Sequence, residues 1–168
     1  QRFSKYQDKQ NYQILSETKS LYEKKRRFTK TEIKEFAVLF IMYNYPDIAS
    51  NKIEEISQII FLSDKNNSLK KSIISLLLEG LSKEKMQSKI SSDFKNLIEE
   101  IQENSSIQII IKAKNNEAIL DLLSEILIEL KELNNLKKIE SLEKELINNL
   151  DENSFSELIK LKSQINRD

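Results

Sequence analysis

The sequence predicts an all-α protein, and three observations support this prediction. The 168 residues include one glycine and one proline, so few positions interrupt a helix. Apolar residues recur every three or four positions along much of the chain, which places them on one face of a helix. Residues 36–43 are apolar on every side, as in a helix that others surround. We therefore expect a bundle of about five to six helices, followed by a long helix that leads into a C-terminal antiparallel helical hairpin.

Three regions are expected along the chain. Residues 1–28 form a linker or N-terminal extension, residues 29–130 the helical bundle and residues 131–168 the C-terminal hairpin. The first region is polar and ends in a basic run at 24–27, Lys-Lys-Arg-Arg. This run can be interpreted as a phosphate-contacting patch, because clustered cations release counterions from a nucleic acid. Acidic residues dilute its charge, however, and we favour a solvated linker.

Start and stop signals place the helices of the bundle. Thr29 and Glu32 fit a capping box at the start of the first helix, and Pro46 suits the first turn of the second. Gly80 stands where a left-handed helix terminator is expected. After the first helix, the expected helices span residues 46–60, 69–79 with a cap within 66–68, 83–90 and 93–103.

Residues 107–114 are the one stretch that resembles a β-strand. Their sequence, Ile-Gln-Ile-Ile-Ile-Lys-Ala-Lys, is rich in β-branched residues. A lone strand would leave its backbone groups without partners. We therefore interpret the stretch as an extended connector that packs against the bundle, and we expect Asn115 or Asn116 to cap the long helix that follows.

The long helix is predicted to have two halves with different surroundings. From Ala118 to Leu130 apolar residues cover most of its circumference, so this half is expected to be buried in the bundle. Beyond Lys131 the apolar stripe is narrower, and this half is expected to project outward and pair only with residues 151–165. The apolar residues of the first half are Ile119, Leu120, Leu122, Leu123, Ile126, Leu127 and Ile128.

A tight polar turn at 150–153 is expected to join the two helices of the hairpin. Either Asp151, or Ser154 together with Glu157, is the predicted cap of the last helix. The contact between the two helices is predicted to consist of Ile139, Leu142, Leu146 and Leu150 on one side and Leu158, Leu161 and Ile165 on the other.

The apolar stripes of the hairpin are wider than one partner helix can cover. Four apolar residues lie beside the predicted contact and are expected to stay partly exposed: Leu136, Ile147, Phe155 and Ile159. An exposed apolar patch surrounded by charge is typical of a protein interface. The predicted partner-binding residues are Leu136, Ile147, Leu150, Phe155, Leu158, Ile159 and Lys162. The alternative is that the residues beside the contact simply pack against the bundle.

Composition argues against several other classes of function. Cysteine and histidine are both absent, which removes thiolate metal sites, disulfides and the commonest general base. The 27 basic and 27 acidic residues are interspersed, so direct nucleic-acid binding through bulk charge is not expected. No apolar run is long enough to cross a bilayer. We expect a cytoplasmic, non-catalytic domain of a longer protein, without a metal, a cofactor, a small-molecule substrate or a membrane contact.

The order of these features resembles the C-terminal helicase-binding domain of bacterial DNA primase. Residues 39–48, Leu-Phe-Ile-Met-Tyr-Asn-Tyr-Pro-Asp-Ile, are similar to the family's run of leucines that ends in Asn-His-Pro-Glu-Leu. Residues 56–64, followed by 69–73, resemble the family's acidic helix, its Phe-Ser-Asp sequence and the next helix. Residues 142–162 are similar to the family's terminal hairpin. The resemblance covers roughly residues 30 to 168; Tyr45 stands where the family often has histidine, and 107–114 has no counterpart.

The resemblance implies a domain that binds the N-terminal domains of the hexameric replicative helicase and brings primase to the replication fork. The catalytic and zinc-binding domains of the parent primase would precede Gln1. Two alternatives remain. The chain could be the N-terminal domain of the helicase itself, which resembles the same domain, or an unrelated helical adaptor protein.

Overall fold

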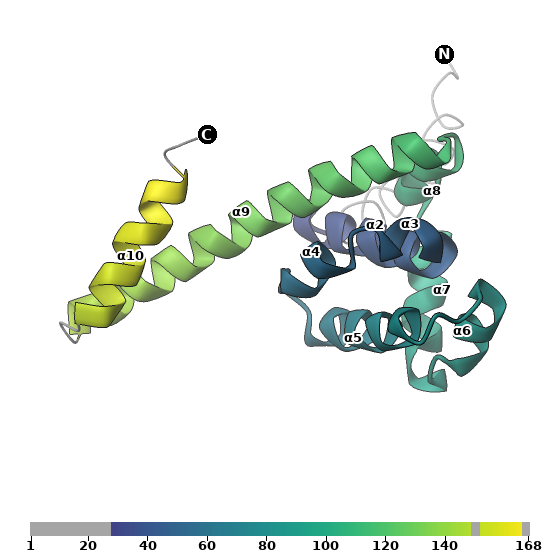
Figure 1. Cartoon of the computed structure of the whole chain (residues 1–168), viewed down its shortest axis with the longest axis horizontal. Helices are drawn as coiled ribbons and strands as arrows, with labels where there is room; N and C mark the ends of the chain where they lie inside the picture. Colours follow the sequence, from purple (N-terminus) through teal and green to yellow (C-terminus); the bar gives the residue numbers. More distant parts are fainter. Residues whose placement is uncertain (1–27, 149–151, 166–168) are drawn as a thin grey trace, which may run out of the picture.

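The computed structural model describes residues 28–148 and 152–165, and it confirms the prediction of an all-α protein. The linker predicted at 1–28, with its basic run, lies outside the described residues except for Phe28. Helices α2 to α8 form a bundle, and α9 runs along one side of it and continues far beyond (Figure 1). The elements are α2 (Lys30–Asn44), α3 (Pro46–Ser50), α4 (Ile53–Gln58), α5 (Asp64–Leu78), α6 (Lys83–Lys89), the 3-10 helix η1 (Ser92–Phe94), α7 (Lys95–Glu103), α8 (Ser105–Lys112), α9 (Asn116–Asn148) and α10 (Glu152–Ile165).

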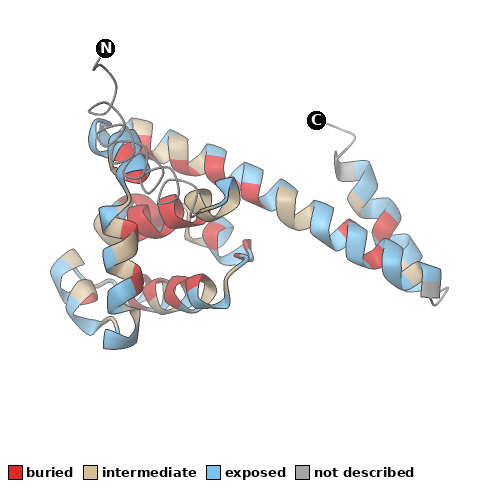
Figure 2. Ribbon diagram, turned by 180° about the vertical axis from the view of Figure 1, so that it is seen from behind, coloured by how far each residue is buried: buried red, intermediate tan, exposed pale blue. Residues whose placement is uncertain are grey.

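Helix α2 is the centre of the bundle. Every residue from Glu35 to Met42 is buried. The sequence predicted burial of residues 36–43, and this is correct for all of them except the last. Tyr43 is only partly buried. The helix packs against α3, α5, α7, α8 and α9, and Figure 2 shows the buried residues concentrated there. Its predicted capping box is present: Glu32 N donates to Thr29 Oγ1 over 3.2 Å, and Thr29 N donates to the Glu32 carboxylate over 2.7 Å.

The connection between α2 and α5 differs from the prediction. The helix expected over 46–60 is divided into α3 and α4, and residues 59–62 lie in the loop that follows α4. Pro46 occupies the first turn of α3 as predicted. The cap expected within 66–68 is wrong, because α5 begins at Asp64 and Ser63 Oγ accepts from Asn66 N over 3.4 Å. Gly80 follows α5 with φ of +67°, the left-handed conformation that was predicted.

The prediction of an extended connector at 107–114 is also wrong, because most of that stretch belongs to helix α8. Asn104 caps α8 by accepting from Ile107 N over 3.3 Å. Ile107 and Ile111 are buried against the bundle, whereas the isoleucines between them face outward. The spacing of four residues between the two buried side chains is that of one helix face. Tertiary packing of this face therefore outweighs the β-propensity of the individual residues.

Helix α9 begins as predicted, with Asn115 Oδ1 accepting from Ala118 N over 2.9 Å. Its first half is buried against the bundle along one face. Ile128 is 59% exposed, so the prediction that it is buried in the bundle is wrong. At 100° per residue, Ile128 points away from the bundle, roughly in the direction of the later contacts with α10. The buried residues of this face are Ile119, Leu123, Ile126, Leu127 and Leu130.

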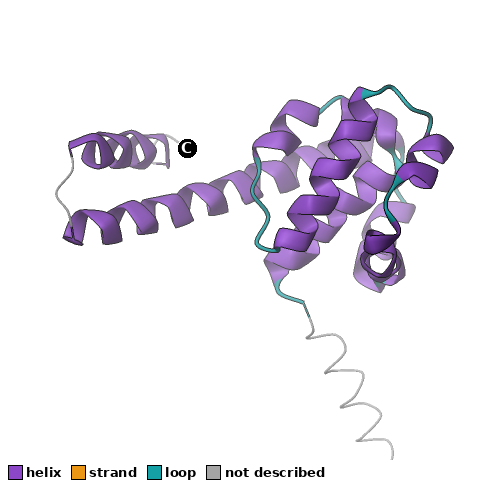
Figure 3. Cartoon of the chain, turned by 90° about the horizontal axis from the view of Figure 1, so that it is seen from below, coloured by secondary structure: helices purple, strands orange, loops and turns teal. Residues whose placement is uncertain are grey.

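Helix α10 packs antiparallel on the projecting part of α9, on the side opposite the bundle (Figures 1 and 3). The register of α9 explains this arrangement. The direction of Ile139 and Leu142, which face α10, differs by about 150° from the mean direction of the residues that face the bundle. The apolar residues that form the core of the bundle and those that pack α10 on α9 are two separate groups with no residue in common. The predicted Asp151 cap lies outside the described residues, and α10 has already begun two residues before Ser154.

Candidate protein-binding side of the C-terminal hairpin

A small apolar core holds the hairpin together. Ile139 and Leu142 of α9 are buried against Leu158 of α10, with Leu146 and Leu161 partly buried beside them. We call these five residues the hairpin core. Leu158, predicted as a partner-binding residue, is only 8% exposed and belongs to this core, so it does not offer a surface to a partner. Leu150 and the side chain of Ile165 lie outside the described residues.

Two ion pairs between α9 and α10 lie on opposite sides of the hairpin core. Lys162 Nζ lies 2.7 Å from Glu143 Oε1, and Lys138 pairs with Glu157. On α9, Lys138 precedes Ile139 and Glu143 follows Leu142, which puts them roughly 140° apart around the helix. The two pairs therefore identify the two sides of the hairpin.

All four apolar residues that were predicted to stay exposed lie on the side of the Glu143–Lys162 pair. On α9, Leu136 and Ile147 are seven and four residues from Glu143. On α10, Phe155 and Ile159 are seven and three residues from Lys162. Residues at these spacings share a helix face. We call Leu136, Ile147, Phe155 and Ile159 the apolar side of the hairpin, and between 51% and 83% of each side chain is exposed.

The side marked by Lys138 and Glu157 has a different composition. On α9 it presents Ser141 and Glu145, and on α10 Asn153 and Lys160, all of them exposed and polar. The hairpin thus has one apolar and one polar side, although both are equally accessible. The four exposed apolar side chains are not needed to keep the hairpin folded, because the hairpin core already supplies the contact between the two helices.

Charged groups border the apolar side. Glu140, one turn after Leu136, accepts a hydrogen bond from Lys144 Nζ over 2.7 Å. This bond and the charge of Lys144 lower the pKa of the Glu140 carboxyl below its ordinary value. Lys162, a predicted partner-binding residue, is half exposed while it pairs with Glu143. Its ammonium group is therefore within reach of a molecule that covers the apolar side.

The structure adds one residue, Glu143, that the sequence analysis did not assign to the site. The sequence spacing does place Glu143 on the same face of α9 as two residues of the apolar side, since Leu136 stands seven residues before it and Ile147 four residues after it. What the spacing alone could not supply is the pairing with Lys162, which identifies the exposed residues of the two helices as one surface. The sequence predicted the exposure of these residues, and their role in binding stays a prediction.

Comparison of the chain with protein-family models, with curated proteins and with solved structures gives no match. Within the described ranges, no helix is both long enough and apolar enough to cross a membrane. Nor do three or more acidic side chains come together there in a group that could bind a metal ion.

Proposed function

We propose that this chain is a protein-docking module that uses the apolar side of its hairpin to bind another protein. The observation that supports this function is the asymmetry of the hairpin: among its described residues, four large apolar side chains are exposed on one side and none on the other. Exposed apolar surface of this kind, bordered by charge, marks protein interfaces. Full burial of each side chain contributes roughly 1.5–3 kcal/mol. Four of them are enough for binding in the micromolar range after the entropic cost of association.

For the partner, we propose the N-terminal domains of the hexameric replicative helicase. The support for this choice is the resemblance of residues 30–168 to the helicase-binding domain of bacterial DNA primase, which has a helical bundle followed by a terminal hairpin. In this role the chain recruits primase to the helicase by protein–protein contact and has no catalytic activity of its own.

The test is a charge placed on the apolar side. Phe155→Asp is expected to abolish binding to the purified N-terminal domains of the cognate helicase, measured by calorimetry, because an aspartate buried without a partner costs several kcal/mol. Phe155 is more than half exposed, so the substitution leaves the hairpin core intact. Ile147→Asp is expected to have the same effect from the other helix.

Matched controls come from the polar side. Asn153→Asp on α10 and Ser141→Asp on α9 introduce the same charge at exposed positions on the side of Glu157 and Lys138. These two variants are expected to bind as the unmodified chain does. Equal affinities of Phe155→Asp and Asn153→Asp would show that the apolar side is not the binding surface. Absence of helicase binding by the unmodified chain would rule out the proposed partner.

A further inference from the structure

Residues 59–62, in the loop between α4 and α5, form a segment whose backbone is bound by side chains from three helices. Lys70 Nζ of α5 donates to Ile59 O. Asn67, also of α5, binds both backbone groups of Phe61, accepting from its N over 2.9 Å and donating to its O over 2.7 Å. Leu62 N donates to Glu35 Oε1 of α2 over 2.5 Å.

The remaining bond of this segment connects it to α9. Ile60 N donates to Asn134 Oδ1 over 3.1 Å. The amide of Asn134 is oriented within α9 by its other end, since Asn134 Nδ2 donates to Leu130 O over 2.7 Å. The acceptor therefore points at a backbone group that α2 and α5 already hold in place. This contact joins two rigid elements without a flexible side chain at either end, because the asparagine is fixed by two bonds.

Asn134 lies where the contact of α9 with the bundle ends. Leu133 still packs partly against the bundle core, and the next buried apolar residue, Ile139, belongs to the hairpin core. Packing at this end is incomplete, because a cavity of about 40 Å³ lies between α9 and residues 60–62. Within the described part of α9, no apolar residue beyond Leu133 packs on the bundle core, so a polar contact at Asn134 acts on the direction of the projecting helix beyond the apolar packing.

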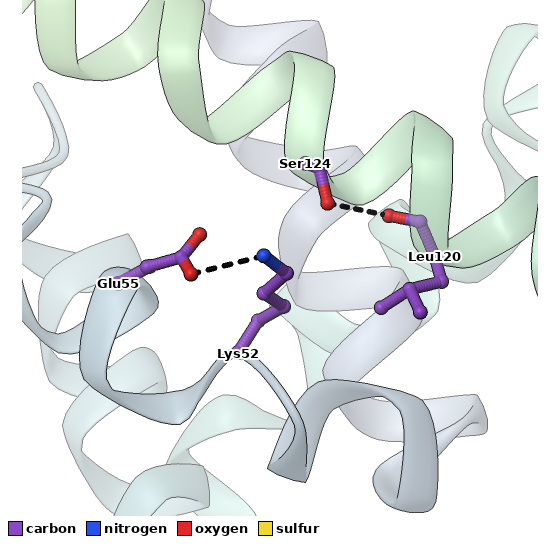
Figure 4. Close-up of polar contacts among 4 residues, drawn as sticks. All are labelled: Lys52, Glu55, Leu120 and Ser124. Carbon is purple, nitrogen blue, oxygen red and sulfur yellow. Dashed lines mark hydrogen bonds and ion pairs between the residues drawn. The ribbon is translucent and has the colours of Figure 1, made fainter.

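Other polar groups along α9 do little to fix that direction. Where α9 passes over α4, Ser124 Oγ donates to Leu120 O within α9, and Lys52 pairs with Glu55 rather than with α9 (Figure 4). Lys34 of α2 does pair with Glu129 of α9 over 2.5 Å. Both side chains of that pair are long, Lys34 is only partly buried and Glu129 is exposed, so the pair is a weak constraint.

We propose that Asn134 is a positioning residue: its bond to Ile60 N fixes the direction in which α9, and with it the hairpin, leaves the bundle. The proposal goes beyond the proposed function, since it concerns the free chain and does not depend on any partner. The group that Asn134 recognises is the backbone of residues 59–62, held by the Glu35, Asn67 and Lys70 side chains.

The experiment measures the distance between bundle and hairpin by pulsed electron paramagnetic resonance. The chain contains no cysteine, so Ser75→Cys on α5 and Ser156→Cys on α10, both at exposed positions, give a unique pair of spin labels. In this background, Asn134→Leu removes the acceptor. Leucine is also the better helix former, so a loss of helix is not the expected effect. A broader distance distribution is expected than in the unmodified chain.

Three further variants distinguish the effect of the hydrogen bond from an effect of helix propensity. Asn135→Leu changes helix propensity equally at a neighbouring position and is expected to leave the distribution unchanged. Asn134→Asp keeps an acceptor for Ile60 N but loses the bond to Leu130 O, so it is expected to broaden the distribution less than Asn134→Leu does. Asn134→Ala removes the acceptor with a smaller side chain and is expected to broaden the distribution as leucine does.

Hydrogen exchange gives a second readout. Amides at 131–138 are expected to exchange about fivefold faster in Asn134→Leu than in Asn135→Leu, which corresponds to the loss of one intramolecular hydrogen bond. Equal distance distributions for Asn134→Leu and Asn135→Leu would overturn the proposal. It would be overturned equally if Asn134→Asp broadened the distribution as much as Asn134→Leu. Neither result bears on whether the apolar side binds a helicase.

Discussion

At the residue scale, the buried Lys70 is the feature with the clearest energetic consequence. Its ammonium group donates to Ile59 O and lies 5.0 Å from the centre of the Phe61 ring. These contacts hold the loop segment 59–62 that Asn134 binds. They also require a charge to be kept out of water, which is costly unless the charge is well compensated. Removal from solvent, and then the nearby charge of Lys71, lower the pKa of Lys70, while Glu35 partly opposes this shift.

The lowered pKa predicts how stability changes with pH. Between the folded-state pKa and the ordinary value of 10.5, the unfolded chain binds the proton more tightly than the folded chain. The contribution of Lys70 to the free energy of unfolding therefore rises as the pH increases through this interval. In urea unfolding, the stability of the unmodified chain relative to Lys70→Met is expected to increase from neutral to alkaline pH.

The exposed Lys65 on the same helix provides the control for this measurement. Lys65→Met removes a charge without changing a buried contact, so its difference from the unmodified chain is expected to vary less with pH. A difference between the unmodified chain and Lys70→Met that stays constant up to pH 10.5 would contradict the prediction.

At the scale of elements, the sequence predicted those helices whose ends have local signals. Thr29 with Glu32, Asn115 and Gly80 each act on neighbouring backbone groups, so their roles could be predicted without knowledge of the fold. Helix α8 and the non-helical segment at 59–62 depend instead on distant partners. The backbone of this segment is bound by side chains of α2, α5 and α9, and no pattern within four residues indicates that.

The site was predictable to a similar degree. The spacing of apolar residues correctly predicted exposure of Leu136, Ile147, Phe155 and Ile159. It placed Leu158 both in the contact between the two helices, which is correct, and on the binding surface, although this side chain is buried in the hairpin core. A stripe of apolar residues gives the direction of each side chain around its helix, whereas which part of the stripe a neighbour covers depends on the crossing of the two helices.

The position of Leu158 predicts that α10 can be detached without unfolding the bundle. Leu158→Asp places a charge among Ile139 and Leu142, at a cost of several kcal/mol if it stays buried. The hairpin core is small, so separation of α10 from α9 is the expected response. Amides of α10 should then lose protection from hydrogen exchange, while those of α2 keep theirs.

Ser156→Asp is the control for this change, because the exposed Ser156 points away from α9 and the substitution adds the same charge. Its α10 amides are expected to exchange as in the unmodified chain. Loss of protection in α2 as well as α10 for Leu158→Asp would instead indicate that bundle and hairpin unfold as one unit.

At the scale of the whole molecule, the two ends of α9 pack through nearly opposite faces, so the bundle that supports the hairpin is separate from the surface proposed to bind a partner. The helix uses one face for the bundle and nearly the opposite face for α10, so each core is complete without the other. A two-helix hairpin of this size is only marginally stable by itself, because short helices bury little area. Continuity of α9 with the bundle gives the hairpin a fixed base, and the hairpin projects away from the bundle (Figure 1).

This separation predicts that the bundle folds without the hairpin. A chain that ends at Lys138 keeps every residue of the bundle core, together with Leu133 and the bond between Asn134 and Ile60 N. It lacks α10 and the whole hairpin core. Thermal unfolding followed by circular dichroism is expected to remain a single cooperative transition at a temperature close to that of the full chain, because the removed residues bury almost nothing against the bundle.

The same shortened chain also tests where binding occurs. Since it retains Leu136 but none of the other residues of the apolar side, it is expected to lose binding to the helicase N-terminal domains as completely as Phe155→Asp does. A shortened chain that is folded and still binds would place the binding surface on the bundle. A shortened chain that fails to fold would show that the hairpin stabilises the bundle through contacts other than the buried core, against the separation of the two cores along α9.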